Sequence, residues 1–115
     1  MSYVDGFVLP VPTKNLAKYR RLARLAGKVW REHGALAYVE CVGDALVGQP
    51  GLPFPKLMKL KEGDSVVFGW VVFESKKHRD QVNALVIKDS RLAKLDFPFE
   101  MKTMTYGGFK VIVAV

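Results

Sequence analysis

Two acidic side chains stand inside segments whose composition is otherwise typical of β-strands. Asp5 lies within Tyr3–Val11, and Glu40 lies within Ala35–Asp44. Acidic residues are depleted in strands, and a carboxylate that is removed from water needs a polar partner. In a partly dry cavity, burial raises the pKa of a carboxylate and so can create a group for proton transfer. Asp5 is therefore either a structural acid with polar or basic neighbours or a carboxylate that lines a pocket.

His78 is the third candidate for proton transfer. It falls in the first turn of a predicted helix, Lys76–Lys88, where the helix dipole disfavours a protonated imidazole. A neutral histidine at the rim of a pocket can act as a base, and a half-buried structural histidine is the alternative. Two histidines and the single cysteine, Cys41, are too few for a zinc site built on those residue types. We therefore expect neither a metal nor another cofactor, and the catalytic roles of Asp5, Glu40 and His78 stay open.

The chain is organised around one long apolar strand, Ser65–Glu74. Both of its alternating faces are apolar, which is typical of a strand in the middle of a sheet that is covered on both sides. One face carries Val67, Gly69, Val71 and Phe73, and the other carries Val66, Phe68, Trp70 and Val72. We expect the first set to meet helices and the second to meet a partner subunit.

The other elements follow from periodicity and from turn residues. Thr13 is expected to cap a helix that ends near His33, where Gly34 suits a left-handed turn. Ser75 is expected to cap the second helix. The remaining segments are expected to be a loop at Asp44–Pro55, a short helical turn at Phe54–Lys61, an irregular stretch at Leu92–Phe99 and a last strand at Lys102–Val113.

This order, β-α-β repeated twice, predicts one α+β domain spanning residues 1–115. Its fold would be the ferredoxin-like βαββαβ arrangement, a four-stranded antiparallel sheet with its helices on one face and its first and third strands central. The other face would then be too apolar to remain in water, and a symmetric homodimer would bury it in a dimeric α/β barrel. We place on that face one parity of the last strand, together with Tyr3, Asp5, Phe7, Tyr38, Glu40, Phe68 and Trp70. Four aromatic residues are candidates for a ligand pocket or for the dimer interface: Trp70, Tyr38, Tyr106 and Phe68.

Charge and composition restrict the location and the partners. The 115 residues carry a formal net charge of +7, and no apolar run approaches the roughly 20 residues that span a membrane. The first residues lack the features of a signal peptide, and the lone cysteine fits a reducing compartment, so we expect a cytoplasmic protein. The first helix holds much of the basic charge, which is either a solvated face or an electrostatic surface for nucleic acid. We disfavour nucleic-acid binding because no recognition motif is present.

Several segments together resemble one family of bacterial proteins. They are Tyr3-Val4-Asp5-Gly6-Phe7, His33-Gly34-Ala35-Leu36, Val39-Glu40-Cys41, Val66-Val67-Phe68-Gly69-Trp70, Ser75 to Asp80 with Asn83, Asp89-Ser90-Arg91 and Met104-Thr105-Tyr106-Gly107-Gly108-Phe109. The set resembles the YbaA-like family of uncharacterised proteins, a domain of unknown function, over nearly the whole chain. Ser90 departs from the family pattern, in which proline stands between the aspartate and the arginine.

The resemblance implies a dimeric α/β-barrel fold but supplies no established catalytic residues. The wider superfamily is similar in fold to small monooxygenases, muconolactone-type isomerases and haem-dependent dismutases, and a shared fold does not give a function. We expect a homodimer that binds a small ligand without an assignable reaction. The alternative is a small cofactor-independent monooxygenase-like or isomerase-like enzyme that uses pocket carboxylates, so whether the protein is an enzyme stays open.

Overall fold

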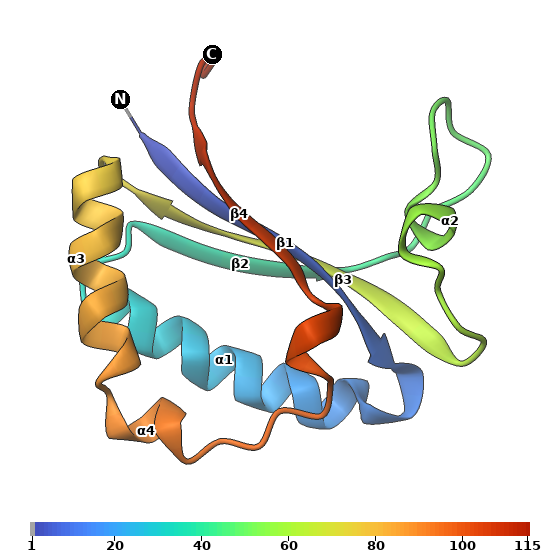
Figure 1. Ribbon diagram of the computed structural model, residues 1–115, viewed down its shortest axis with the longest axis horizontal. Helices are drawn as coiled ribbons and strands as arrows, with labels where there is room; N and C mark the ends of the chain where they lie inside the picture. The colour runs from blue at the N-terminus through green and yellow to red at the C-terminus, as the bar shows by residue number, and fades with distance from the viewer. Residues whose placement is uncertain (1) are drawn as a thin grey trace.

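The structure, a computed structural model, describes residues 2–115 and is built on a four-stranded antiparallel sheet (Figure 1). The strands follow the spatial order β2-β3-β1-β4. Their bounds are β1 Tyr3–Pro12, β2 Ala37–Val42, β3 Asp64–Phe73 and β4 Thr105–Lys110. The first and third strands are therefore central, as the doubly apolar Ser65–Glu74 predicted.

Helices cover one face of this sheet and leave the other face open (Figure 1). The helices α1 and α3 lie below the sheet in that view, with the short α4 beside them, while α2 stands to one side. Their bounds are α1 Leu16–Glu32, α2 Phe54–Met58, α3 Lys76–Ile87 and α4 Ser90–Ala93, with 3-10 turns at Thr13–Asn15 and Met101–Thr103. The α+β prediction is confirmed. The helix α2 lies within the short helical turn expected at Phe54–Lys61, and α4 is the one short helix that the sequence did not indicate.

The register between the central strands decides which side chains meet the helices. In β1 and β3, Phe7 pairs with Gly69 and Asp5 pairs with Val71, so the odd-numbered residues of both strands share a face. These residues are the buried ones along β1, which alternates regularly between buried and half-buried positions. Val67, Gly69, Val71 and Phe73 therefore face the helices, as the sequence predicted.

The same register corrects the predicted contents of the opposite face. Tyr3, Asp5 and Phe7 lie on the helix face, and so do Tyr38 and Glu40, which pair with Val71 and Gly69. Only Phe68 and Trp70 of the predicted set lie on the open face, together with Phe109. The physical reason is the apolar run of β1, because Leu9 and Val11 continue the odd parity into the core and carry Asp5 with them.

The ends of several elements also differ from the sequence prediction. Thr13 opens a 3-10 turn and bonds Ser65 through its hydroxyl, 2.8 Å between oxygens, rather than capping α1. The last strand ends at Lys110 instead of Val113, because Lys110 pairs with Tyr3, the first residue of its neighbour β1. By contrast, Gly34 has the expected positive φ of 120°, and Ser75 caps α3 by accepting from His78 N at 3.1 Å.

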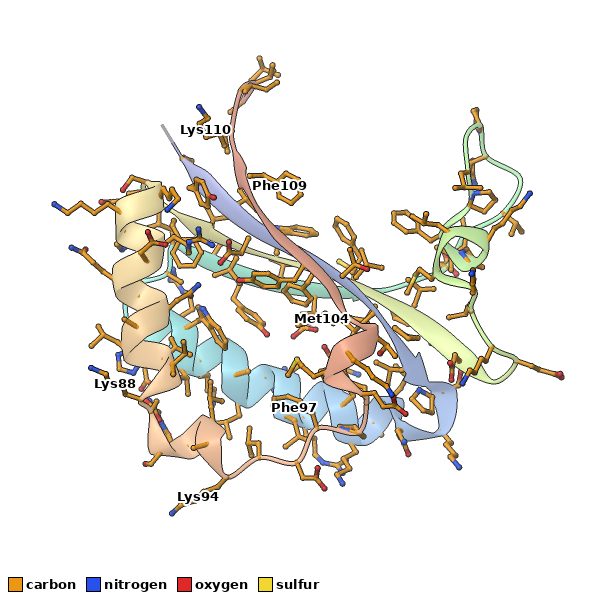
Figure 2. All side chains as sticks on the ribbon, in the orientation of Figure 1. Lys88, Lys94, Phe97, Met104, Phe109 and Lys110 are labelled. Atoms are coloured by element: carbon orange, nitrogen blue, oxygen red, sulfur yellow. The ribbon has the colours of Figure 1, made fainter. Side chains whose placement is uncertain are left out.

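The segment that follows α4 closes the core near the start of α1. Phe97 and Phe99 pack on Tyr19 with ring centroids 6.5 and 5.7 Å apart. Phe97 lies on the helix side of the sheet, whereas Phe109 lies on the open side (Figure 2). The two sides of the sheet thus differ sharply, since one carries the core and the other exposes aromatic rings.

Gly69 in β3 leaves the space that the Phe7 ring occupies on the helix side of the sheet. A Cβ atom at position 69 would overlap that ring, whereas a Cβ at Gly107 of β4 would approach Phe109 no closer than 3.5 Å. We expect Gly69→Ala to lower the free energy of unfolding by about 1–3 kcal/mol through overpacking. Gly107→Ala is the matched control and should change it by less than about 0.5 kcal/mol. Urea unfolding of both variants measures this, and equal effects would contradict the packing described.

Candidate functional site

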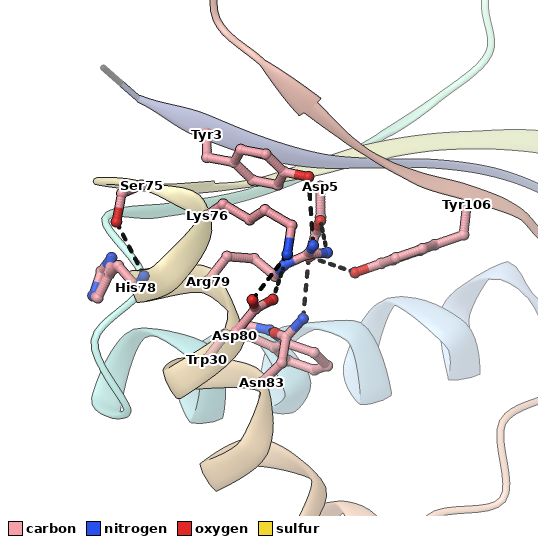
Figure 3. Close-up of polar contacts among 10 residues, drawn as sticks. All are labelled: Tyr3, Asp5, Trp30, Ser75, Lys76, His78, Arg79, Asp80, Asn83 and Tyr106. Atoms are coloured by element: carbon pink, nitrogen blue, oxygen red, sulfur yellow. Dashed lines mark hydrogen bonds and ion pairs between the residues drawn. The ribbon is translucent and has the colours of Figure 1, made fainter.

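Asp5 is fully buried and is held by three side chains from other elements (Figure 3). Arg79 Nη1 donates to Asp5 Oδ1 at 2.9 Å, while Asn83 Nδ2 and the Tyr106 hydroxyl donate to Oδ2 at 3.2 and 2.6 Å. Arg79 and Asn83 are one turn apart on α3, so a single helix face supplies two of the three donors. The carboxylate is thus paired and hydrogen-bonded, which is the condition for burying a charge.

Arg79 is itself fixed by neighbours beyond Asp5. Its Nη2 lies 3.4 Å from the Tyr3 hydroxyl, and its guanidinium carbon lies 4.9 Å from the centre of the Tyr3 ring. Its Nε lies 2.8 Å from Asp80 Oδ1. Burial lowers the pKa of Arg79, but the negative charge of Asp5, followed by Tyr3 and Asp80, holds this pKa above its usual range. This cluster joins α3 to β1, and Asp5 has no exposure to solvent.

Asn83 connects this cluster to α1. Its side-chain oxygen accepts from Trp30 Nε1 at 3.0 Å, and the Trp30 ring packs on Tyr38 of β2 with centroids 5.8 Å apart. Asp5 therefore reaches the second acidic residue through a continuous chain of contacts. Tyr38 is the link, because its hydroxyl donates to Glu40 Oε2 at 2.6 Å.

Of the two acidic residues inside strands, Glu40 is only half-buried, whereas Asp5 is fully buried. The Tyr19 hydroxyl of α1 donates to Glu40 Oε1, so the carboxylate is held between two phenols. An ionised carboxylate has about four acceptor positions, and the two tyrosines use two of them. The other positions stay available to a donor that approaches from outside the pair.

The phenols around both carboxylates are hard to ionise. Burial, together with the hydrogen bond and the negative charge of Glu40, raises the pKa of Tyr19 and of Tyr38 far above the usual value. Burial and the hydrogen bond to Asp5 raise the pKa of Tyr106 in the same way. These tyrosines therefore act near neutral pH as hydrogen-bond donors and not as proton acceptors.

A groove of about 1120 Å³ runs between α1 and the edge strand β2, with Glu40, Tyr19 and Tyr38 in its lining. Its apolar surface comes from Leu16, Ala23, Val39, Val42 and Val67. Basic side chains of α1 form the outer wall, and they are Arg20, Arg24, Lys28 and Arg31. The groove combines an apolar interior with a few polar groups, which is the usual composition of a small-molecule site.

The predicted site residues are divided among four places. Tyr106 joins Asp5, and Tyr38 joins Glu40, whereas Phe68 and Trp70 lie on the open face with ring centroids 5.6 Å apart. His78 accepts from Glu74 N at 3.0 Å, and its ring points away from Asp5 (Figure 3). Among residues 2–115, no group of three or more His, Cys, Asp or Glu side chains is placed to hold a metal ion.

Sequence reasoning missed three residues that organise the site: Tyr19, Arg79 and Asn83. The spacing of Tyr19 is that of the apolar stripe of α1, and nothing in the sequence indicates that its hydroxyl bonds Glu40 of β2. Arg79 and Asn83 do carry a signal, since their spacing of four places both on one helix face. A buried acid in a strand, such as Asp5, needs hydrogen-bond donors, and this pair supplies two of them.

The family of the chain follows from comparison with known proteins. Residues 2–102 match the family described as "Protein of unknown function (DUF1428)". The chain belongs to this family. It is also 37% identical over 115 residues to "Uncharacterized protein YbaA" of Escherichia coli (strain K12), covering 98% of each chain, and the match to YbaA of Shigella flexneri has the same identity and coverage. The predicted membership of a YbaA-like family of unknown function is confirmed.

A solved structure with a similar fold is titled "De novo designed protein Foldit4". It superposes with a TM-score of 0.53 over 96% of this chain and 99% of that chain, at 13% sequence identity. At this identity the similarity describes the fold alone.

Within residues 2–115, no helix is both long and apolar enough to cross a membrane.

The raised tyrosine pKa values predict how stability changes in alkali. Above about pH 10 the tyrosines of the unfolded chain ionise, while Tyr19, Tyr38 and Tyr106 of the folded chain stay protonated. The unfolded state then binds fewer protons, so the free energy of unfolding is at its full value below about pH 10 and falls as the pH rises beyond it. At about pH 11, the absorbance of ionised tyrosine should be weak in the native protein and strong in protein unfolded by urea. Equal bands in both states would contradict this assignment.

Proposed function

We propose that this protein is a cytoplasmic homodimer that binds a small ligand in the groove between α1 and β2, with no reaction assigned to it. Residues 1–115 would form one ferredoxin-like βαββαβ domain, and two such domains would pack sheet against sheet as a dimeric α/β barrel. The strand order β2-β3-β1-β4 with antiparallel neighbours supports this assignment.

The composition of the open sheet face supports the dimer. Among the strand residues on that face, Asp64 at the start of β3 is the one with a charge. The exposed rings include Phe68 and Phe109, which are 42% and 61% exposed. A contiguous apolar face of this kind marks an interaction site, and a two-fold axis would let the same face cover itself.

The single observation that carries ligand binding is the Glu40 carboxylate at the floor of an apolar groove. Two phenols fix its position, and two acceptor positions remain for a hydroxyl or amine of a ligand. Asp5 has no such opening, because it is fully buried and its donors come from the protein. The ligand site is therefore centred on Glu40 rather than on the open-face pair Phe68 and Trp70.

The second candidate function is a cofactor-independent isomerase-like or monooxygenase-like enzyme. Glu40 favours it, since a carboxylate that lines a groove can remove a proton from a bound carbon acid. It would work alone, because Tyr19 and Tyr38 stay protonated and Asp5 lies outside the groove. Deuterium exchange into the methyl group of pyruvate, with Glu40→Gln as control, tests for such a base. Exchange that is equal with and without the protein would count against this second function.

Filling the groove should prevent ligand binding. N-phenylnaphthylamine, a neutral apolar dye whose fluorescence rises in dry sites, serves as the probe. Val42 lines the groove and is exposed, so Val42→Trp should fill the space without disturbing the core. We expect it to weaken dye binding by about tenfold or more, which corresponds to about 1.4 kcal/mol.

The matched control for this experiment is Val47→Trp. Val47 is also exposed but lies outside the groove, so this variant should bind the dye as the wild type does. Equal binding by both variants would remove the groove as the site. Loss of binding only in an open-face variant would place the dye on the sheet instead.

Dimerisation should depend on the open face and not on exposed apolar residues elsewhere. Phe68→Lys places a charge in the centre of the proposed interface, at a residue that is 42% exposed in the single chain. Analytical ultracentrifugation should show a dimer for the wild type and a monomer for this variant. Ile87→Lys on α3, where Ile87 is 79% exposed, is the control and should remain dimeric. A monomeric wild type at micromolar concentration would refute the dimer.

A further inference from the structure

We infer that the groove binds a single-chain anionic amphiphile, with its apolar chain inside the groove and its carboxylate, sulfate or phosphate ester against α1. This inference rests on the proposed ligand site and names the chemical class of the ligand. It starts from the basic charge of α1, whose arrangement a merely solvated helix face does not explain.

The basic residues of α1 are not spread evenly around the helix. Arg20, Arg24 and Lys28 recur at every fourth position, so they form one row, and all three line the groove. Lys14, Lys18 and Arg21 belong to the same basic segment but lie outside the lining. The groove wall therefore concentrates positive charge along its length.

This row has no acidic partner within the part of the chain that the structure describes. No Asp or Glu among residues 2–115 lies within ion-pair distance of Arg20, Arg24 or Lys28. Other arginines are engaged: Arg79 pairs with Asp5 and Asp80, and Arg91 pairs with Asp89 and Glu32. Three cations that face one groove attract an anion more strongly than isolated surface cations do.

The acids of the groove are outnumbered by this row of cations. Glu32 is paired with Arg91 at 2.6 Å, and Glu40, which accepts from two neutral phenols, contributes at most one negative charge against three cations. The groove is thus positive along α1 and apolar where Ala23 and Val67 line it. Its volume of about 1120 Å³ lies slightly above the usual range for small-molecule sites, which leaves room for an extended chain.

The test measures displacement of N-phenylnaphthylamine by decanoate and by decanol, which share a chain and differ in the charge of the head group. The variant carries Arg20→Gln, Arg24→Gln and Lys28→Gln. The matched control carries Lys14→Gln, Lys18→Gln and Arg21→Gln, which removes the same charge from the same region outside the groove. Circular dichroism and thermal unfolding establish that both fold.

For the wild type we expect decanoate to bind more tightly than decanol, and added salt to reduce this preference. The groove variant should lose about tenfold in decanoate affinity, about 1.4 kcal/mol for three exposed charges together, while decanol binding is unchanged. The control variant should lose less than about twofold.

Two results would overturn the inference. One is equal binding of decanoate and decanol by the wild type, and the other is an equal loss in both variants. In either case the dye would still bind in the groove, so the proposed ligand site would be kept and only the anionic class of its ligand would be refuted. If Val42→Trp also left dye binding unchanged, the proposed ligand site itself would be refuted.

Discussion

The buried ion pair between Asp5 and Arg79 is the interaction on which the rest of the structure depends. A charge with no exposure on a central strand must be paired, and removing one partner of such a pair costs about 3–5 kcal/mol. The pair fixes α3 against β1, and Asn83 extends the same contact to Trp30 of α1. Because Trp30 packs on Tyr38, the position of α1 relative to β2 also follows from the Asp5 cluster.

The groove runs between α1 and the edge strand β2, the two elements that this chain of contacts joins. Two acidic strand residues thus take different roles in one framework. Asp5 is enclosed by its donors and organises the elements, whereas Glu40 faces the groove with acceptor positions unused. A ligand bound as proposed would reach Glu40 without displacing the donors of Asp5, so the acid that stabilises the fold and the acid proposed to bind are different residues.

Much of the fold could be predicted from the sequence, because local patterns specify its elements. Ser75 caps α3, Gly34 ends α1, and the residues of β3 that were expected to face the helices do so. The face of β1 was not predicted, although Leu9 and Val11 carry its odd-numbered residues into the core, because Asp5 interrupts that apolar parity. The partner that lets Asp5 be buried is Arg79, 74 residues away, and no local pattern reports such a contact.

The site was predictable only as residue types. Asp5, Glu40, Tyr38 and Tyr106 were named as candidates, but no sequence pattern separates them from Phe68 and Trp70. Pairing across the sheet places the aromatic pair on the opposite face. Tyr19 was hidden because a hydroxyl on an apolar helix stripe looks like core, and its bond to Glu40 depends on how α1 crosses β2.

The most direct measurement is a crystal structure grown with decanoate that carries bromine at its far end. We expect an anomalous bromine peak between α1 and β2 beside Val67 and Ala23, with the carboxylate toward Arg20, Arg24 and Lys28. A bromine peak on the open face beside Phe68 and Trp70, with the groove empty, would contradict it.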